Sequence, residues 1–142
     1  MSDFKIFDIA GSGMSAQSVR LNTVASNLAN ADSVSGDPSS VYRAKHPVFK
    51  AVLGEGLGAG GGVDAATATV EVTGIAQSQA APQSRYDPGN PLADAQGYVY
   101  APAVNVVEEM TDMISASRSY QNNVEVLNTA RDLMLDTLKL GQ

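Results

Sequence analysis

The stretch NVVEEMTDMISASRSYQNNVEVLNTARDLMLDTLKLG, residues 105–141, decides the expected fold. Apolar and small side chains recur in it at alternating spacings of four and three, the heptad pattern of a helix that packs against another helix. Asn105 is a suitable N-cap, Glu108 follows in the capping-box position, and Gly141 is a stop signal. The pattern predicts one helix roughly 50 Å long at ~1.5 Å per residue. Its expected seam is Val106, Met110, Met113, Ser117, Tyr120, Val124, Leu127, Arg131, Met134 and Leu138.

A second long helix is expected from about Asp3 to Asn30. It also shows two heptad rows, although Gly11-Ser12-Gly13 is a possible kink and residues 32–38 are dense in turn residues. The rows are Phe7, Met14, Leu21 and Leu28, and Ala10, Gln17, Val24 and Ala31. We therefore expect a mainly α protein with a small β part, in which the N- and C-terminal helices pair as an antiparallel coiled coil.

A long part of each expected helix carries very few charges. Residues 10–31 contain one charge, Arg20, and residues 113–130 contain two, Arg118 and Glu125. Soluble chains are about 25% charged, and a helix that faces water usually carries charge on its outer side. The additional apolar residues beside the C-terminal seam also make its apolar stripe wider than one partner helix requires. These helices are expected to be covered on several sides, by copies of the protein or by relatives of it.

The segment between the helices has a different character, and the expected domains are 1–35, 36–102 and 103–142. Alternating residues at 48–53 and 66–73 predict two half-buried strands, and 98–100 a third. The glycine-rich stretch 54–62 is read as a linker, and Asp87–Pro91 as a turn. Residues 36–102 are therefore expected to form a small β-rich middle domain.

No residue pattern supports catalysis, a cofactor or a metal site. The chain has no cysteine and a single histidine, His46, so the usual zinc sites are excluded. Asp87, Asn90 and Asp94 do not match the calcium-loop spacing. The acidic residues Glu108, Glu109 and Asp112 are interpreted as a charged first turn that complements the helix dipole. We expect neither an enzyme nor a cofactor-dependent protein.

The sequence also argues against nucleic acid and membrane partners. The net charge is −6 and the nine Lys and Arg residues are scattered, whereas phosphate binding needs clustered cations. No run approaches ~18 apolar residues, so direct membrane insertion is not expected. The N-terminus lacks the basic start and apolar core of a cleavable signal peptide, so leaving the cytoplasm would require another export machinery.

Several motifs resemble the bacterial flagellar axial family. The segment SNLANAD (26–32) is similar to its N-terminal signature. The segments YDPGNPLADAQGY (86–98), MISASRSYQNNVEVLNTA (113–130) and TLKLGQ (137–142) resemble its proximal rod proteins, whereas 54–81 shows no specific match. The motif residues are Ser26, Asn27, Leu28, Ala29, Asn30, Pro88, Gly89, Asn90 and Pro91.

This resemblance implies a structural subunit of the flagellar basal-body rod. Such a subunit would be exported without a cleavable signal by the flagellar type III apparatus and would assemble helically in the periplasm to transmit torque from motor to hook. The implied partners are copies of itself, the rod proteins FlgB, FlgF and FlgG, the adaptor FliE, the membrane ring protein FliF and the export apparatus. The terminal helices would form the inner, tube-lining domain.

Two other classes of protein share some of these sequence features with a polymer subunit. A cytoplasmic coiled-coil adaptor or export chaperone without self-assembly would also lack catalytic residues, but a free chaperone needs charged, solubilising faces. A needle subunit of a related secretion system would not be expected to carry residues 86–98. If the chain is a rod subunit, we expect mobile ends in the monomer. We also expect Arg131 to reach the lumen or to pair with an acidic residue of a neighbour.

Overall fold

The computed structural model describes residues 3–53 and 68–140. Its elements, in chain order, are α1 (Asp3–Asn30), β1 (Lys45–Leu53), β2 (Ala68–Gln77), β3 (Gln83–Tyr86), β4 (Tyr98–Ala101) and α2 (Val106–Leu140). The prediction of a mainly helical chain with two long terminal helices and a small β part is confirmed. The predicted linker 54–62 and the start of the second predicted strand, residues 66 and 67, lie outside the described residues.

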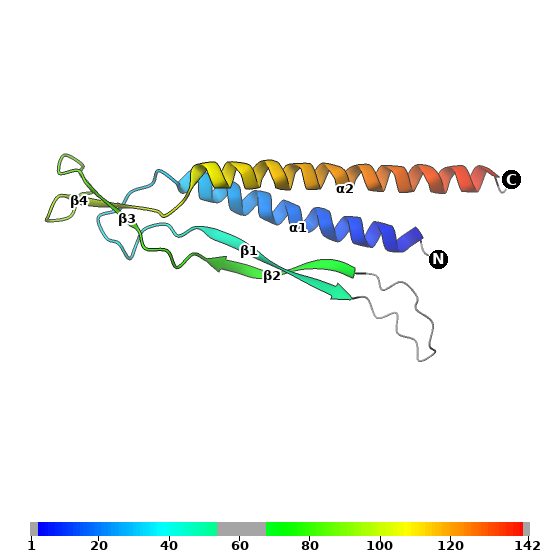
Figure 1. The fold of residues 1–142 in the computed structure, drawn as a ribbon, viewed down its shortest axis with the longest axis horizontal. Coiled ribbons are helices and arrows are strands. Elements are labelled where there is room, and N and C mark those ends of the chain that lie inside the picture. Colours follow the sequence, from blue (N-terminus) through cyan, green and yellow to red (C-terminus); the bar gives the residue numbers. More distant parts are fainter. Residues whose placement is uncertain (1–2, 54–67, 141–142) are drawn as a thin grey trace.

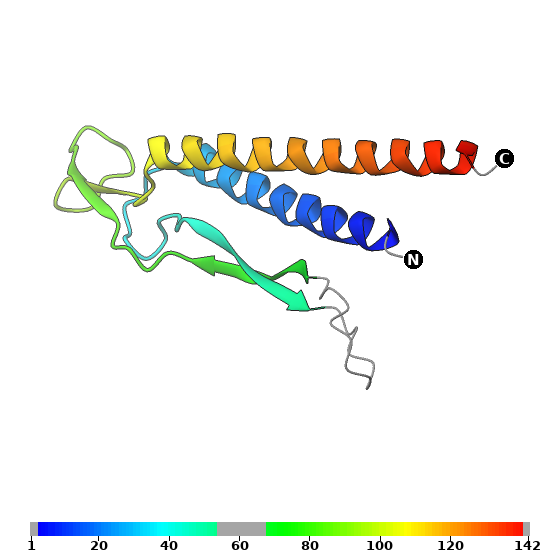
Figure 2. The ribbon, with the colours of Figure 1, turned by 45° about the vertical axis from the view of Figure 1, so that its right-hand side comes forward.

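The two helices lie side by side and run in opposite directions, so the N- and C-terminal ends lie at the same end of the molecule (Figure 1). The hairpin formed by β1 and β2 lies along the other side of α1, and α1 is therefore sandwiched between α2 and this hairpin (Figure 2). Strands β3 and β4 form a separate tip at the far end, beyond the point where α1 ends and α2 begins.

Helix α1 is continuous through Gly11-Ser12-Gly13, where a kink was possible. Gly13 has a packing role there, because a Cβ atom on it would lie 2.8 Å from Nδ2 of Asn123 on α2. The α2 N-cap is confirmed: Oδ1 of Asn105 accepts hydrogen bonds from the backbone N–H groups of Val107 (3.1 Å) and Glu108 (3.4 Å).

The buried apolar side chains of the two helices are small. On α1 the buried apolar residues are Ala10, Ala16 and Val24, and on α2 they are Ala116 and Ala130. Small residues let the two backbones approach closely, so few large side chains are enclosed between them. The fully buried side chains with the largest volume in the described residues are Val99, in the tip, and Asn27.

One of the two rows of the expected α2 seam lies one residue away from the most deeply buried positions of α2. Glu109, Ala116 and Ala130 are buried, and each directly precedes a seam position of one predicted row, Met110, Ser117 and Arg131. Met110 (53% exposed) and Leu138 (68% exposed) thus face outward within the chain. In the other predicted row, Met113, Leu127 and Met134 are half-buried and Tyr120 is exposed.

The β part consists of two separate two-stranded antiparallel sheets. In the first, Lys45 pairs with Gln77 and Leu53 with Ala68, and a bulge near Val48 and Phe49 leaves Thr73 as the extra residue on β2. The prediction of half-buried strands is wrong for this hairpin, because residues of both alternating sets, such as Val48 and Phe49, are exposed. The reason is that one narrow hairpin covers α1 without a second layer over it.

The second sheet forms the tip. The predicted strand at 98–100 is confirmed as β4, and it pairs with β3, which was not predicted. The predicted turn is confirmed, since the Asn90 N–H donates to the Asp87 carbonyl at 3.2 Å. Asp94 orders the rest of the loop: its Oδ1 accepts from the N–H groups of Gln96 and Tyr98. These bonds, led by that of Tyr98, hold the pKa of Asp94 below its ordinary value.

Candidate functional site: a polar junction and the outer helix faces

The motif residue Asn27 lies at the centre of a buried polar cluster, here called the polar junction, made of Asn27, Tyr42, Lys45 and Glu109. Asn27 is 0% exposed and makes four hydrogen bonds. Its Nδ2 donates to the Lys45 carbonyl and to Oε1 of Glu109, both at 2.9 Å. Its Oδ1 accepts from the Lys45 N–H and the Tyr42 hydroxyl, also at 2.9 Å. One side chain of α1 therefore joins the start of β1 to the first turns of α2.

Glu109 is the acidic member of the junction; it lies in the first turn of α2 as expected, but it is buried instead of forming part of a charged face. The residue is only 6% exposed, and Oε2 has no hydrogen-bond partner among the described residues. Burial raises the pKa of Glu109 above its ordinary value, and the hydrogen bond from Asn27 opposes that rise. Glu108, by contrast, is exposed as expected.

Two further contacts support the junction. Ser26, another motif residue, shares a 3.0 Å hydrogen bond with the Tyr42 hydroxyl. Arg20 and Asp112 form an ion pair between α1 and α2 at 3.5 Å, and both side chains are partly exposed. Water weakens such a pair. The position of the helices therefore depends more on the buried amide of Asn27 than on this ion pair.

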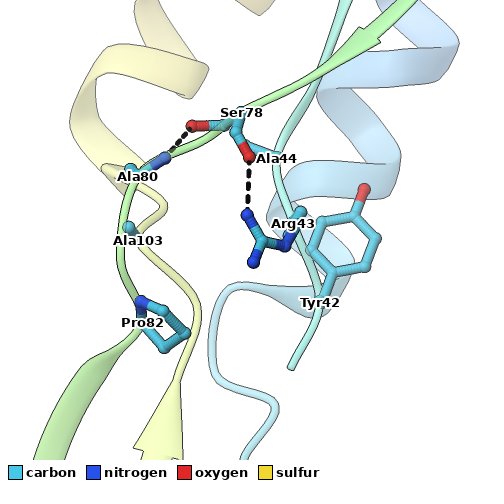
Figure 3. A pocket seen from close by; sticks show the side chains of 7 residues that line it. All are labelled: Tyr42, Arg43, Ala44, Ser78, Ala80, Pro82 and Ala103. Atoms are coloured by element: carbon cyan, nitrogen blue, oxygen red, sulfur yellow. Dashed lines mark hydrogen bonds between the residues drawn. The ribbon is translucent and has the colours of Figure 1, made fainter. Parts of the chain in front are cut away.

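A narrow neck connects the junction to the tip. There the backbone N–H of Ser78 donates to the Ala44 carbonyl at 2.8 Å. Arg43 Nη1 donates to the Ser78 carbonyl at 3.4 Å (Figure 3). The neck encloses a cavity of about 10 Å³, which is about the space of one water molecule. It is lined by Tyr42, Arg43, Ala44, Ser78, Ala80, Pro82 and Ala103 (Figure 3). This neck is too small to be a substrate site.

Large apolar side chains remain uncovered along α2. In its first half Val107 (73%), Met110 (53%) and Ile114 (55%) are exposed at spacings of three and four, on the side away from Glu109 and Ala116. We call these three residues the outer α2 face. Its second half exposes Val126, Leu133, Leu135 and Leu138. Apolar patches of this kind mark interaction surfaces in soluble proteins.

The other motif residues lie apart from the junction. Leu28 is half-buried, Ala29 is exposed, and the Asn30 amide donates to the Ser26 carbonyl within α1. The tip motif residues Pro88, Gly89, Asn90 and Pro91 form a turn on the surface. The residues predicted for the helix seams are thus distributed between the intramolecular contact and open faces, and their role as subunit contacts stays a prediction.

The described residues offer little for catalysis. Within 3–53 and 68–140 there is no group of three or more His, Asp or Glu residues arranged to hold a metal ion. None of the helices in this part of the chain is long and apolar enough to cross a membrane. His46 is exposed beside the start of β1.

The sequence of this chain is similar to those of known protein families and known proteins. Two family models match: "Flagella basal body rod protein" over residues 7–36, which includes the Asn27 motif, and "Flagellar basal body rod FlgEFG protein C-terminal" over residues 95–140. The chain is 55% identical to the flagellar basal-body rod protein FlgC of Yersinia enterocolitica and 54% identical to that of Salmonella typhi, over the full length of each. It is 41% identical to that of Agrobacterium fabrum, covering 93% of this chain and 90% of the relative.

The paired terminal helices, the apolar outer faces and the matched segments together define a structural protein of the flagellar axial class. Within that class, the chain belongs to the FlgC family of flagellar basal-body rod proteins. It is a structural subunit of the bacterial flagellar basal-body rod, and its family is not one of enzymes.

Proposed function

We propose that this subunit assembles helically with copies of itself and with other rod proteins through the outer α2 face. The observation that carries the proposal is the outer α2 face, where Val107, Met110 and Ile114 are more than half exposed in the isolated chain. Covering one such side chain completely contributes on the order of 1.5–3 kcal/mol. A row of them can hold neighbouring subunits together without any charged contact.

The finer details of this function are inferences that the family supports. We infer that the flagellar type III apparatus exports the chain, that it assembles in the periplasm, and that the rod transmits torque from motor to hook. Its neighbours would be FlgB, FlgF, FlgG, the adaptor FliE and the ring protein FliF. The helices, in segments 1–35 and 103–142, would form the tube and residues 36–102 the part outside it. The low charge of residues 10–31 and 113–130 supports this arrangement, because surfaces with few charges can pack closely.

Substituting the outer α2 face tests the proposal. Ile114→Asp places a charge on this face, and we expect it to lower the amount of subunit in isolated basal bodies by about tenfold or more, with loss of swimming. Asn122→Asp adds the same charge on an exposed polar position of α2 and is the matched control. Circular dichroism of both purified monomers shows whether each still folds.

The competing hypothesis, a cytoplasmic adaptor or export chaperone, predicts a different result. Such a protein would be found in the cytoplasmic fraction. It would be absent from isolated basal bodies both in its original form and as the Ile114→Asp variant. Normal incorporation of Ile114→Asp into rods would show that the outer α2 face is not a subunit contact.

A further inference from the structure

A second cavity lies beside the polar junction, at the first turns of α2. It measures about 140 Å³ and is lined by Ala44, His46, Ser78, Ala103, Val104, Asn105, Glu108, Glu109 and Asp112. Three of these residues are acidic. Among the described residues, the one basic side chain in an ion pair with any of them is Arg20, which pairs with Asp112. The cavity therefore has an excess of negative charge.

The buried carboxylate of Glu109 points to a ligand for this cavity. Its Oε1 accepts from Asn27, but within residues 3–53 and 68–140 its Oε2 has no hydrogen-bond partner, although the residue is only 6% exposed. A buried acceptor without a partner costs free energy, and a carboxylate costs more than a neutral group. A cationic donor that enters the cavity would provide both the missing hydrogen bond and the missing charge.

The chemistry of the wall favours a side chain over a metal ion. Among the described residues, no group of three His, Asp or Glu residues is arranged as a metal site. Oε1 of Glu109 already accepts a hydrogen bond from Asn27, and Oδ1 of Asp112 already pairs with Arg20. A lysine or arginine, in contrast, needs only one or two oxygen acceptors. The lining of the cavity joins the first turns of α2 to His46 near the start of β1, and His46 and Glu108 are both exposed.

We propose that this cavity receives a lysine or arginine side chain of an adjoining subunit, which donates to Glu109 and lies between Glu108 and Asp112. The proposal rests on the rod function above and names one contact within it. It differs from the outer α2 face in chemistry, since it is a charged and partly buried contact. It also differs in position, since Glu109 lies on the inner side of α2.

Glu109→Gln separates this role from a structural one. Glutamine keeps the Oε1 acceptor for Asn27 and removes the buried charge, so the monomer should be as stable as the original or more stable at neutral pH. Incorporation into basal bodies should nevertheless fall about tenfold or more, because a buried charge pair between subunits loses one partner. Glu125→Gln makes the same change at an exposed α2 position and should leave incorporation unchanged.

Cross-linking identifies the partner directly. The chain has no cysteine, so His46→Cys places a single thiol at the rim of the cavity. Isolated basal bodies carrying it would be treated with short thiol-to-amine and thiol-to-guanidinium linkers, and the products mapped by mass spectrometry. We expect links to a lysine or arginine of another subunit, reduced about tenfold when Glu109→Gln is added.

Two outcomes would overturn the proposal. The first is that the thiol of the His46→Cys variant forms cross-links only to Arg20 or Lys45 of the same chain. The other is equal incorporation of Glu109→Gln and Glu125→Gln, which would leave a water molecule as the partner of Oε2. An Ile114→Cys variant, tested for cross-links between subunits in the same basal bodies, reports on the rod contact independently. If it cross-links while the cavity does not, the rod function stands and the cavity proposal fails.

Discussion

Replacing Asn27 with alanine should destabilise the subunit more than any other single truncation on α1. The substitution removes four hydrogen bonds from a side chain that is 0% exposed. The Lys45 N–H, the Lys45 carbonyl and Oε1 of Glu109 would lose their side-chain partner. The Tyr42 hydroxyl keeps Ser26 as a partner. Leaving a buried polar group unsatisfied costs about 1–3 kcal/mol.

Because water can enter the vacated space and satisfy part of these groups, we expect a total loss of about 3–5 kcal/mol in the free energy of unfolding. That is a large fraction of the 5–15 kcal/mol typical of a folded domain. The assay is urea unfolding of the purified monomer followed by tyrosine fluorescence, since the chain has five tyrosines and no tryptophan. The midpoint should move to lower urea, and amides near Lys45 should lose protection from hydrogen exchange.

Asn30→Ala is the matched control. Its amide makes one hydrogen bond, to the Ser26 carbonyl within α1, and alanine is a better helix former. It should therefore change stability by less than about 1 kcal/mol. If Asn27→Ala also costs less than about 1 kcal/mol, the polar junction does not hold the helices and β1 together, and the reasoning is refuted.

The remaining predictions concern single features of the fold. The raised pKa of Glu109 means that its contribution to stability is complete below the unfolded pKa and is lost as pH rises through the folded one. Unfolding measured across pH should therefore show Glu109→Gln gaining stability over the original chain as pH rises, whereas an equal difference at all pH values would contradict this. Gly36→Ala should destabilise the tip by about 1–3 kcal/mol, because its Cβ would lie 2.5 Å from the Leu92 carbonyl oxygen; an unchanged melting temperature would count against it. Backbone NMR of dilute monomer should show mobile ends on both helices, and rigid ends would reject the idea that they become fully ordered on assembly.

Local signals in the sequence were enough to predict the elements that depend on neighbouring residues. The α2 N-cap at Asn105 and the turn at Asp87–Pro91 depend on hydrogen bonds between residues only a few positions apart. Such bonds do not depend on how distant segments of the chain pack. The two long helices follow from heptad spacing for the same reason. Strand β3 was missed because its sequence, QSRY, has no alternating apolar residues, and it becomes a strand only by pairing with β4.

The motif around Asn27 was found by resemblance, but its physical role was not apparent from its neighbours in sequence. Asn27 and Glu109 are 82 positions apart, and the polar junction forms only when α1, β1 and α2 meet. One of the two predicted seam rows of α2 was also placed one residue away from the buried positions Glu109, Ala116 and Ala130. The heptad pattern indicates which side chains are apolar, whereas small residues such as Ala116 and Ala130 decide where two backbones can approach most closely.

The sequence by itself therefore determined the helices, the N-cap of α2, the turn at Asp87–Pro91, the low charge of residues 10–31 and 113–130, and the family to which the chain belongs. Only the tertiary structure decided which face of α2 meets α1. It also decided that Glu109 is buried, with no partner for Oε2 among the described residues, and that Val107, Met110 and Ile114 remain exposed. The physical reason is that helix formation depends on contacts within a few residues, whereas burial depends on partners far away in the chain. For a rod subunit, some of those partners belong to other molecules.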